Sequence, residues 1–529
     1  MKADRLPRLA CLSAIGLAVC CGSVLTSEIS HGTRQTWYWD SVVNVHFDNH
    51  GRPLAKGISV DRLVSEIESL PVDMIQVGAY GGKGLHASFP WKGNVRGFAQ
   101  PDSWDSLAVW SEVARRTGKR FHLYTNTFNG ITPEDLAAEN PQFQGDRYGA
   151  GYQKFIKDVF LPILNGALAR YHPQGVWVDG SEALINDPTG SRQRIAHSVH
   201  QHNAETMMTF NHSWLNLVCG WPDPRTPPPF VDTLSCDRGG GGDKTLACTR
   251  VQGMFYSSLD RIPHDIMNAV DKPGVSYHRL LQMGGVTLAS GGSWFLWVDR
   301  TEGESVLESL ETVREAAQWA VQRKPALGRT RSANPTAVLV SETQWKEGGT
   351  TYGKLGPAGL AWDDETPLVQ ACALALQEQG FLVDIVNEEI LIEHLDRYRR
   401  VFVPGSPKLG KATENALGIL ESRGSTVVRN APARPSGHGP DVRAINNTSG
   451  CIFSLRRQAD SNRYVLHVID LREQKRPGMA FSLHLPSEPK QVWVYPPSVQ
   501  IEHTWSGGGG TVGLEAFAVH AAIVFDCEP

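Results

Sequence analysis

The sequence lacks the features that mark several classes of protein. Its 529 residues carry 51 Lys and Arg against 55 Asp and Glu, a formal charge of −4, and they contain no basic run. Phosphate groups are bound by concentrated Lys and Arg, so this pattern argues against a nucleic-acid partner or an anionic membrane surface. Beyond the first 27 residues no apolar run approaches the roughly 20 residues of a transmembrane helix, and we expect no membrane span.

Sequence spacings typical of metal sites are absent as well. There is no C-x-x-C pair and no H-E-x-x-H motif, so we expect neither a metal nor a cofactor. Three of the nine cysteines lie in the first 27 residues, and we expect the other six to be buried thiols or disulfide partners. These six are Cys219, Cys236, Cys248, Cys372, Cys451 and Cys527.

The first 27 residues have the layout of a secretory signal peptide. Lys2, Arg5 and Arg8 precede an apolar stretch over residues 9–19. We therefore predict an exported protein, which is periplasmic, secreted or an outer-membrane lipoprotein. The run Leu17-Ala-Val-Cys20 loosely resembles a bacterial lipoprotein box, although Val stands where a small residue is usual. A lipid anchor is thus an alternative to a free soluble protein.

Residues 34–328 alternate short apolar runs with amphipathic stretches. Eight strands alternating with helices predict a (β/α)₈ barrel, in which helices cover a closed parallel sheet. The stretch 276–289 fits either a strand or a helix. The predicted strands are 38–47, 74–79, 120–124, 175–178, 206–210, 231–235, 262–267 and 293–298, with helices at 106–117, 154–171 and 192–205.

Two smaller domains are expected to follow the barrel. Residues 333–432 repeat the strand–helix alternation on a smaller scale, which predicts a doubly wound, flavodoxin-like α/β domain. Residues 433–529 switch to period-two strands separated by Pro and Gly, which is typical of a β-sandwich. We expect the α/β domain to pack against another subunit, giving a dimer or trimer.

One segment of the α/β domain is placed like a phosphate-binding loop. Residues 405–413 follow a strand and open a helix, and they contain Lys411. However, Ala412 stands where a metal-binding hydroxyl is needed, and Pro407 removes a backbone donor. A plain strand-to-helix turn accounts for the segment.

The first candidate for chemistry is Asp179. Residues 171–180 run from a helix end through a turn into an apolar strand that finishes on Asp179 and Gly180. Barrel enzymes place their reactive groups at the C-terminal ends of strands. An ionised carboxylate there, beside Trp177, is what a glycosidase nucleophile requires. The alternative is a carboxylate that only caps the following turn or helix.

Glycoside hydrolysis generally needs a second carboxyl group, which protonates the leaving oxygen. Asp237 is the candidate, because it ends the sixth predicted strand and the glycines at 239–242 would let a loop approach a ligand. The alternative is a turn residue before a glycine loop. Asp232, Asp265 and Glu182 remain open as acid/base candidates.

Other predicted strand ends carry residues suited to sugar binding. Trp is an efficient platform for sugar rings, and the sequence has 15 of them. His, Asn and Asp can hydrogen-bond hydroxyls while aromatic rings cover the apolar face of the sugar. The candidates are Trp39, His46, Asp48, His86, His122, Tyr124, Asn126, Trp177, Asn211, His212, Trp214, Asp265 and Asn268.

Several segments resemble a known family. The stretches WYWDSVVNVHFD at 37–48, ENP at 139–141 and YHPQGVWVDG at 171–180 look like the α-L-fucosidase-like glycoside hydrolases and their uncharacterised relatives. The α/β domain resembles the trimerisation-type domain of some β-galactosidases and fucosidases. The run YVLHVIDL at 464–471 looks like their terminal β-domain.

The resemblance implies a function and a nucleophile. The Asp of the W-x-D-G element is the fucosidase nucleophile, and it maps onto Asp179; the acid/base varies among these families, so Asp237 rests on strand order alone. Two departures put fucose specificity in doubt: only His86 is present where a histidine pair is usual, and Asp237 stands where a Glu is expected. The expected protein is an exported, exo-acting, retaining glycoside hydrolase, with an α-L-fucoside as first substrate. The alternatives are a galactosidase-type hydrolase of the same architecture and a non-catalytic carbohydrate-binding barrel.

Overall fold

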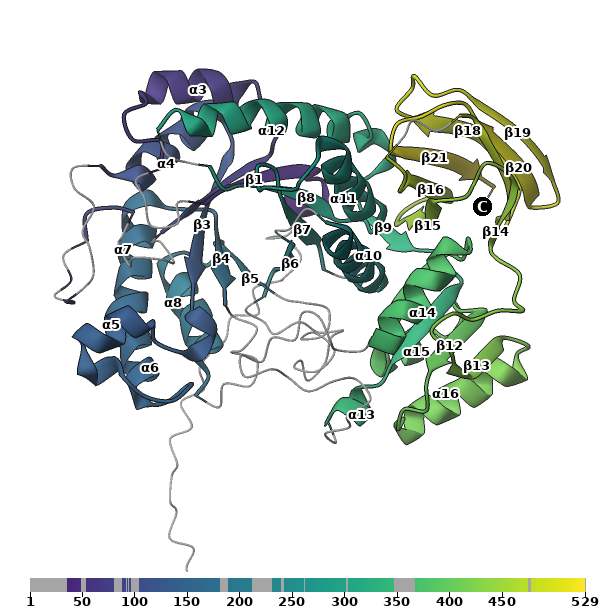
Figure 1. The fold of residues 1–529 in the computed structure, drawn as a ribbon, viewed down its shortest axis with the longest axis horizontal. Helices are drawn as coiled ribbons and strands as arrows, with labels where there is room; N and C mark the ends of the chain where they lie inside the picture. Colours follow the sequence, from purple (N-terminus) through teal and green to yellow (C-terminus); the bar gives the residue numbers. More distant parts are fainter. Residues whose placement is uncertain are drawn as a thin grey trace, which may run out of the picture.

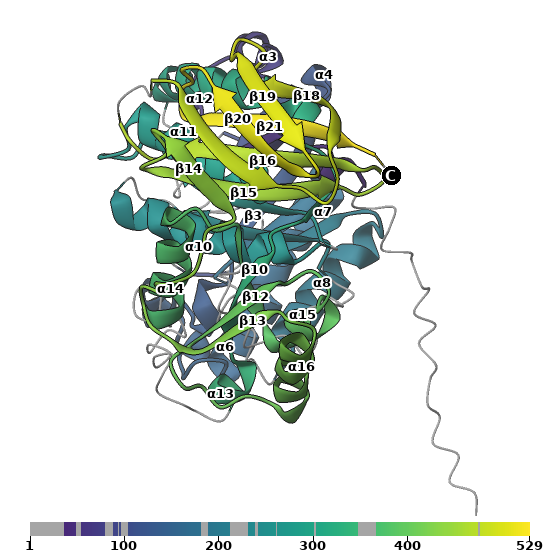
Figure 2. The ribbon, with the colours of Figure 1, turned by 90° about the vertical axis from the view of Figure 1, so that its right-hand side faces the viewer.

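The protein folds into a barrel flanked by two smaller parts (Figure 1). The α/β part and the C-terminal β part lie beside each other on one flank of the barrel, as both views show (Figures 1 and 2). The computed structural model describes residues 36–48, 54–79, 88–91, 93, 95–96, 104–180, 189–211, 231–238, 242–260, 262–300, 303–346, 367–473 and 477–528.

The barrel is a closed sheet of eight parallel strands in sequence order, with β1 pairing with both β2 and β8. This confirms the barrel predicted from the sequence. The strands are β1 Val43–Phe47, β2 Met74–Gly78, β3 Arg120–Asn126, β4 Gly175–Asp179, β5 Met207–Asn211, β6 Thr233–Arg238, β7 His264–Ala269 and β8 Ser293–Val298.

Helices surround the barrel, and side-chain caps explain where several begin. Asp105 accepts from the amide of Ala108 to start α4, which ends at Gly118 in the left-handed region. Ser276 caps α11 in the same way, so the stretch 276–289 is a helix. No described helix is long and apolar enough to cross a membrane. The main helices are α3 Val60–Glu68, α4 Ser106–Thr117, α5 Glu134–Glu139, α6 Ala150–Phe155, α7 Leu161–Tyr171, α8 Ser191–His202, α10 Asp243–Ser258, α11 Tyr277–Ala289 and α12 Ser305–Val321.

The barrel interior is filled by a separate cluster of large side chains. The prediction of one strand over 38–47 is wrong in its first half, because Thr36–Trp39 forms the one-turn helix α2. Tyr38 from α2 joins the interior cluster instead of pairing in the sheet. The buried members of this cluster are Tyr38, Met74, Trp177, Met207, Met267 and Phe295.

The second part is a parallel sheet in the order β11-β10-β12-β13, as expected for a doubly wound α/β domain. Its strands are β10 Thr336–Val340, β11 Val383–Asn387, β12 Arg400–Pro404 and β13 Thr426–Ala431. Its helices are α13 Glu342–Lys346, α14 Pro367–Glu378, α15 Glu388–Glu393 and α16 Lys411–Ser422.

The third part consists of two antiparallel sheets, which confirms the β-rich C-terminal region (Figure 2). One sheet has the order β14-β17-β20-β19, and the other has the order β18-β21-β16-β15-β9. The short strand β9, Thr330–Ser332, lies between the barrel and the α/β domain in the chain. The others are β14 Val442–Asn446, β15 Cys451–Gln458, β16 Arg463–Asp470, β17 Met479–His484, β18 Pro489–Tyr495, β19 Ile501–Ser506, β20 Gly509–Leu514 and β21 His520–Cys527.

The three parts are joined by buried charged groups. Arg397 of the α/β domain pairs with Asp260, which follows α10 of the barrel, and lies 4.0 Å from Asp384. Arg456 of the C-terminal sheet donates to Ser257 Oγ at 2.8 Å and to the carbonyl of Thr330 at 3.0 Å. Because unpaired buried charges are costly, this network favours one arrangement of the parts.

The described cysteines form no disulfides. Cys236, Cys248, Cys372, Cys451 and Cys527 are thiols outside any disulfide, and all but Cys248 are buried. The sequence left buried thiols and disulfides open, and for these five the structure shows thiols.

Candidate active site

Asp179 is the last residue of β4, at the C-terminal end of the barrel. The four residues before it are buried, whereas Asp179 itself is half-buried. Gly180 follows with φ +60°, in the left-handed region that lets the chain turn sharply away from the strand. The carboxylate is thereby held at the barrel mouth with part of its surface accessible.

Four donors converge on the Asp179 carboxylate. Oδ2 accepts from the Tyr124 hydroxyl at 2.7 Å and from Asn126 Nδ2 at 3.0 Å. Oδ1 accepts from Asn211 Nδ2 and from the backbone amide of Gly180, both at 2.7 Å. Both oxygens act as acceptors, as those of an ionised carboxylate do, and their direction is fixed by side chains from the two neighbouring strands, β3 and β5, and by the turn after β4.

The backbone at the ends of β3 and β4 is tied together beneath this carboxylate. Thr127 donates from its amide to the carbonyl of Asp179 at 2.9 Å, and from its hydroxyl to the carbonyl of Gly180 at 2.8 Å. Phe128 adopts φ +52°, and its amide donates to Asn126 Oδ1 at 2.6 Å. A non-glycine residue in that region is uncommon, and the surrounding hydrogen bonds hold it there.

Tyr124 is a permanent hydrogen-bond donor in this arrangement. Burial, together with the nearby carboxylates of Asp179 and Asp48, raises the pKa of its hydroxyl well above the usual value. Its ring stacks on Trp177, with centroids 5.3 Å apart and planes 20° from parallel. Trp177 is buried in the barrel interior, so it supports Tyr124 from below rather than facing a ligand.

His46 of β1 lies beside Tyr124, and Trp297 of β8 lies beside His46. The ring of His46 lies 4.9 Å from that of Tyr124 and 6.4 Å from that of Trp297. Lys272 Nζ lies 3.3 Å from the centre of the Trp297 ring, within cation–π range. The sequence did not single out Trp297 or Lys272 as site residues. Trp297 could have been found from strand alternation, because it is the fifth residue of β8 and pairs in register with His46.

The structure brings six predicted residues to the same end of the barrel. His46 and Asp48 are buried at the end of β1, where the amide of Asp48 donates to the carbonyl of Val298. The side chains that gather around Asp179, directly or through Tyr124, are His46, Asp48, Tyr124, Asn126, Trp177 and Asn211.

Two further predicted residues lie deeper in the barrel. Asp265 is the second residue of β7 and is fully buried, and it accepts from the hydroxyls of Tyr38 and Ser235. Burial raises its pKa to about 7, against the lowering effect of these two hydrogen bonds. His122 is also buried, edge-on to Trp37, and burial lowers its pKa to about 3. Both belong to the interior packing of the barrel rather than to its mouth.

Trp39 and Asn268 are corrections to the predicted site. Trp39 belongs to α2, before the first strand, and the Arg329 guanidinium lies 5.7 Å from its ring centre. Asn268 accepts from the indole of Trp294 at 3.1 Å and lies 3.6 Å from Met283 of α11, so it faces the helices outside the sheet. A residue near a strand end has an equal chance of facing outward, which the sequence argument did not take into account.

The acid/base candidates are only partly described. Asp237 is the next-to-last residue of β6 and pairs in register with Met267, but its side chain lies outside the described part of the structure. Asp232 is fully buried, and its carboxylate accepts from the amide of Met208 at 2.8 Å, which ties β5 to the segment before β6. The predicted residues Glu182, His86, His212 and Trp214 lie outside the described residues.

The segment that resembles a phosphate-binding loop is filled by a carboxylate of the chain itself. Glu388 Oε2 accepts from the amide of Gly410 at 2.8 Å and from the Thr413 hydroxyl at 2.6 Å. Its other oxygen accepts from the amide of Thr343 at 2.8 Å and from Ser341 at 3.0 Å. The start of α16 therefore holds an internal anion where a phosphate would sit.

The described residues contain no cluster of three or more His, Cys, Asp or Glu side chains that could hold a metal ion. In the part of the chain that the structure describes, the barrel mouth holds the half-buried carboxylate of Asp179 with the hydroxyl and amide groups that donate to it. His46, Asp48 and Lys272 lie nearby.

The fold is shared with bacterial glycoside hydrolases of known structure. The α-L-fucosidase isoenzyme 2 from Paenibacillus thiaminolyticus matches with a TM-score of 0.70 and 13% sequence identity, over 92% of this chain and 100% of that chain. The β-galactosidase from Bacillus circulans sp. alkalophilus matches with a TM-score of 0.56 and 11% identity, over 92% of this chain and 99% of that chain. No protein-family model matches the sequence, and neither does any curated protein.

These similarities confirm the structural resemblance predicted from the sequence segments. The closed eight-stranded barrel belongs to a fold that the chain shares with the α-L-fucosidase glycoside hydrolases. At such low sequence identity the shared property is the fold, and function must be argued from the site.

Proposed function

We propose that this chain is a retaining glycoside hydrolase whose nucleophile is Asp179. The observation that carries the proposal is the carboxylate at the mouth of the barrel, half-buried and oriented by four hydrogen bonds. A nucleophile in this chemistry must be ionised and rigidly aimed at the anomeric carbon. Donors from Tyr124, Asn126 and Asn211 serve both requirements.

The proposed reaction has two steps. An oxygen of Asp179 bonds to the anomeric carbon as the glycosidic C–O bond breaks, and the acid gives its proton to the leaving oxygen. The same acid, now ionised, then takes a proton from water, and the water oxygen displaces Asp179 from the sugar. Asp237 is the proposed acid/base, since it lies near the end of β6 in the same barrel.

The resemblance to α-L-fucosidase-like enzymes and the matching fold favour an α-L-fucoside as substrate, cleaved from a chain end. A galactoside comes second, because a β-galactosidase shares the architecture. The N-terminal segment supports export, with a lipid anchor as the alternative to a free protein. The α/β domain is the proposed contact in a dimer or trimer, which light scattering would detect.

The experiment compares wild-type protein with Asp179→Asn on a panel of chromogenic glycosides and native oligosaccharides. Replacing the nucleophile by an amide is expected to lower kcat by roughly 10³-fold or more. Asp135→Asn, at an exposed position of α5, is the matched control and should keep the wild-type rate. Melting temperatures measured in parallel show that each variant is folded.

Three outcomes separate the alternatives. Near wild-type turnover by folded Asp179→Asn contradicts the nucleophile assignment. Saccharide affinity without turnover by the wild-type protein indicates a carbohydrate-binding barrel in place of an enzyme. A glycosyl adduct on the Asp179 peptide, trapped with a slow 2-fluoro glycoside and detected by mass spectrometry, supports the retaining mechanism.

A further inference from the structure

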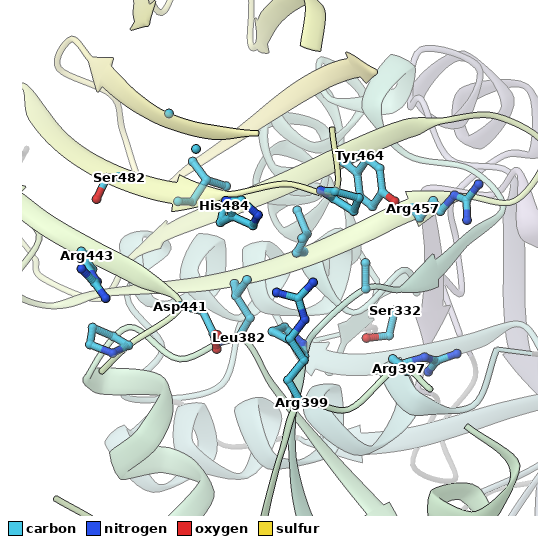
Figure 3. A pocket seen from close by; sticks show the side chains of 18 of the residues that line it. Ser332, Leu382, Arg397, Arg399, Asp441, Arg443, Arg457, Tyr464, Ser482 and His484 are labelled. Atoms are coloured by element: carbon cyan, nitrogen blue, oxygen red, sulfur yellow. The ribbon is translucent and has the colours of Figure 1, made fainter. Parts of the chain in front are cut away.

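A cavity lies outside the barrel, between the α/β domain and the C-terminal sheets. Its volume is about 1140 Å³, which exceeds the roughly 300–1,000 Å³ typical of sites for drug-sized ligands. All of its lining residues fall between Arg331 and Thr511 in the sequence, so none belongs to the barrel or to the surroundings of Asp179. We call this cavity the interdomain cleft (Figure 3).

Arginines dominate the charge of the interdomain cleft. Six arginines line it against two aspartates, although the chain as a whole has a formal charge of −4. Figure 3 shows Arg399 between Arg443 on one side and Arg397 and Arg457 on the other. The arginines are Arg331, Arg397, Arg399, Arg400, Arg443 and Arg457, and the aspartates are Asp396 and Asp441.

Two of these arginines are neutralised within the fold. Arg397 pairs with Asp260 from the barrel. Arg400 lies 2.7 Å from Asp441, whose second oxygen accepts from the Thr336 hydroxyl and from the amide of Leu382. Both pairs stabilise the junction between domains. The charges of Arg397 and Arg400 are neutralised by these carboxylates and are not available to a ligand.

Four arginines keep their charge available to the cleft. Among the described residues, Arg331, Arg399 and Arg443 have no carboxylate within ion-pair distance, and all three side chains are exposed. Arg457 donates only to neutral oxygens, the carbonyl of Ser461 and Asn462 Oδ1. A guanidinium remains protonated at any ordinary pH, so the cleft has a positive electrostatic potential that favours binding of an anion.

The C-terminal sheets also bring groups suited to sugar binding to the cleft. Tyr464 and Trp505 pack at the edge of the C-terminal core and also line the cavity. Ser482, Thr504 and Thr511 also line the cavity, and the hydroxyls of the two threonines lie 2.9 Å apart. Aromatic surface beside hydroxyl donors and acceptors is the usual composition of a carbohydrate site.

We propose that the interdomain cleft binds an anionic oligosaccharide. Its sulfate or carboxylate groups would pair with Arg399 and Arg443, because a guanidinium matches either group with two parallel hydrogen bonds. Its rings would lie against Tyr464 and Trp505. The choice of a glycan over a nucleic acid rests on the proposed function together with the hydroxyl-lined wall, and the cleft would hold a charged polymer on the enzyme while the barrel acts on its ends.

The test is calorimetric titration of the full-length protein with four probes. These are a sulfated carrageenan hexasaccharide, its desulfated counterpart, a hexagalacturonate and its methyl-esterified counterpart. At least one charged probe is expected to bind, with an affinity that falls as salt rises, while its neutral counterpart binds at least tenfold more weakly. Which charged probe binds distinguishes sulfate from carboxylate recognition.

Variants locate the binding to the cleft. Arg399→Ala and Arg443→Ala are each expected to weaken binding about tenfold, and the double variant more strongly. Arg429→Ala, on exposed β13 outside the cleft and paired with Glu414 at 2.9 Å, is the matched control and should bind like the wild type. If one alanine variant does not fold, as judged by its melting temperature, the other variant alone carries the comparison.

Several results would overturn the proposal. They are equal binding of charged and neutral probes, unchanged affinity in the folded arginine variants, and tighter binding of a DNA hexanucleotide than of either charged oligosaccharide. Titration of Asp179→Asn separates this proposal from the proposed function, because the cleft should bind its probe even in a protein without hydrolytic activity. Loss of binding in Asp179→Asn alone would place the anion site in the barrel and contradict the proposal.

Discussion

The position of the Asp179 carboxylate depends on side chains from two neighbouring strands. Tyr124 and Asn126 reach it from β3 and Asn211 reaches it from β5, each within 3.0 Å. A hydrogen bond to a charged group contributes about 1.5–3 kcal/mol. Since reaction requires a fixed distance between a carboxylate oxygen and the anomeric carbon, loss of one donor should affect rate more than stability.

We expect Asn211→Ala to lower kcat by roughly 10–100-fold, which corresponds to the loss of one such hydrogen bond in the transition state. Steady-state kinetics on the preferred glycoside would measure the change, and thermal unfolding should show only a small shift. Asn165→Ala is the control, since Asn165 accepts from Ser198 at 2.7 Å between α7 and α8, far from the barrel mouth. An unchanged kcat in Asn211→Ala would mean that this donor does not orient the nucleophile.

At the scale of elements, one carboxylate organises the C-terminal edge of the α/β sheet. Glu388, in the first turn of α15, receives hydrogen bonds from the start of α16, from Ser341 after β10 and from Thr343 in the first turn of α13. Although burial opposes it, the donors, led by Thr413, lower the pKa of this carboxyl below its ordinary value. The Glu388 carboxylate therefore links α15 to α13 and α16 at this edge of the sheet.

Replacing this group should destabilise the protein and change its response to acid. We expect Glu388→Ala to lower the free energy of unfolding by about 2–4 kcal/mol, because several buried donors lose their acceptor. The lowered pKa means that the contribution is present above the ordinary glutamate value near 4.3 and is lost as pH falls below it. Urea unfolding at pH 7 and pH 4 would measure both effects. A difference between variant and wild type that does not shrink at pH 4 would contradict this account.

Most elements could be predicted from the sequence, and the exceptions have physical reasons. Most barrel strands are short segments rich in apolar residues, and they alternate with amphipathic stretches that predict helices. Residues 37–39 have strong strand propensity but form a helix, because Tyr38 closes the barrel interior and tertiary packing overrides propensity. The three-residue strand β9 has no pattern of its own and exists only because β15 pairs with it.

The candidate site was predictable where strand order alone brings residues together. Asn126 and Asp179 end neighbouring strands in register, so their contact follows from the topology. Asn268 was misassigned because its place near a strand end does not tell which face it takes, and Trp39 was misassigned because its segment forms α2 instead of a strand. Lys272 was missed because its contact with Trp297 joins a loop to the neighbouring strand, which no local spacing reveals.

At the scale of the whole molecule, buried histidines occur both within the barrel strands and in the C-terminal sheet that packs against the barrel. His467 and His520 stack where the C-terminal sheet meets the barrel, with ring planes 3° from parallel and facing nitrogens 3.0 Å apart. Burial lowers the pKa of His122, His264 and His467 to about 3, and that of His520 well below its usual value. These rings are neutral in the folded protein.

Acid should therefore begin to destabilise the folded protein at pH values well above the pKa of ordinary carboxylates. Below about pH 6.5 the unfolded chain takes up protons on these histidines while the folded chain does not, so the free energy of unfolding falls by about 1.4 kcal/mol per pH unit for each. Asp265 has the opposite effect. Because burial raises its pKa to about 7 in the folded protein, it binds a proton in the folded chain at pH values where the unfolded chain does not. Urea unfolding between pH 7.5 and 5 would show the slope.

His264→Asn serves as the check. Removing one buried histidine should reduce the pH dependence of the free energy of unfolding by the amount that corresponds to about one proton. His264 bonds Ser290 at 2.9 Å, and an amide can keep that contact. An equal slope in the folded variant and the wild type would contradict the assignment of the effect to buried histidines.

The strand β9 has a consequence for how the chain can be divided. Thr330–Ser332 is synthesised before the whole α/β domain, yet it forms the edge of a sheet whose other strands come more than a hundred residues later. A fragment that starts after the α/β domain would leave the edge of β15 bare and open to pairing with another copy. The α/β domain is in effect an insertion within the C-terminal unit, so excision, domain exchange or circular permutation should treat 330–332 and 442–528 as one piece.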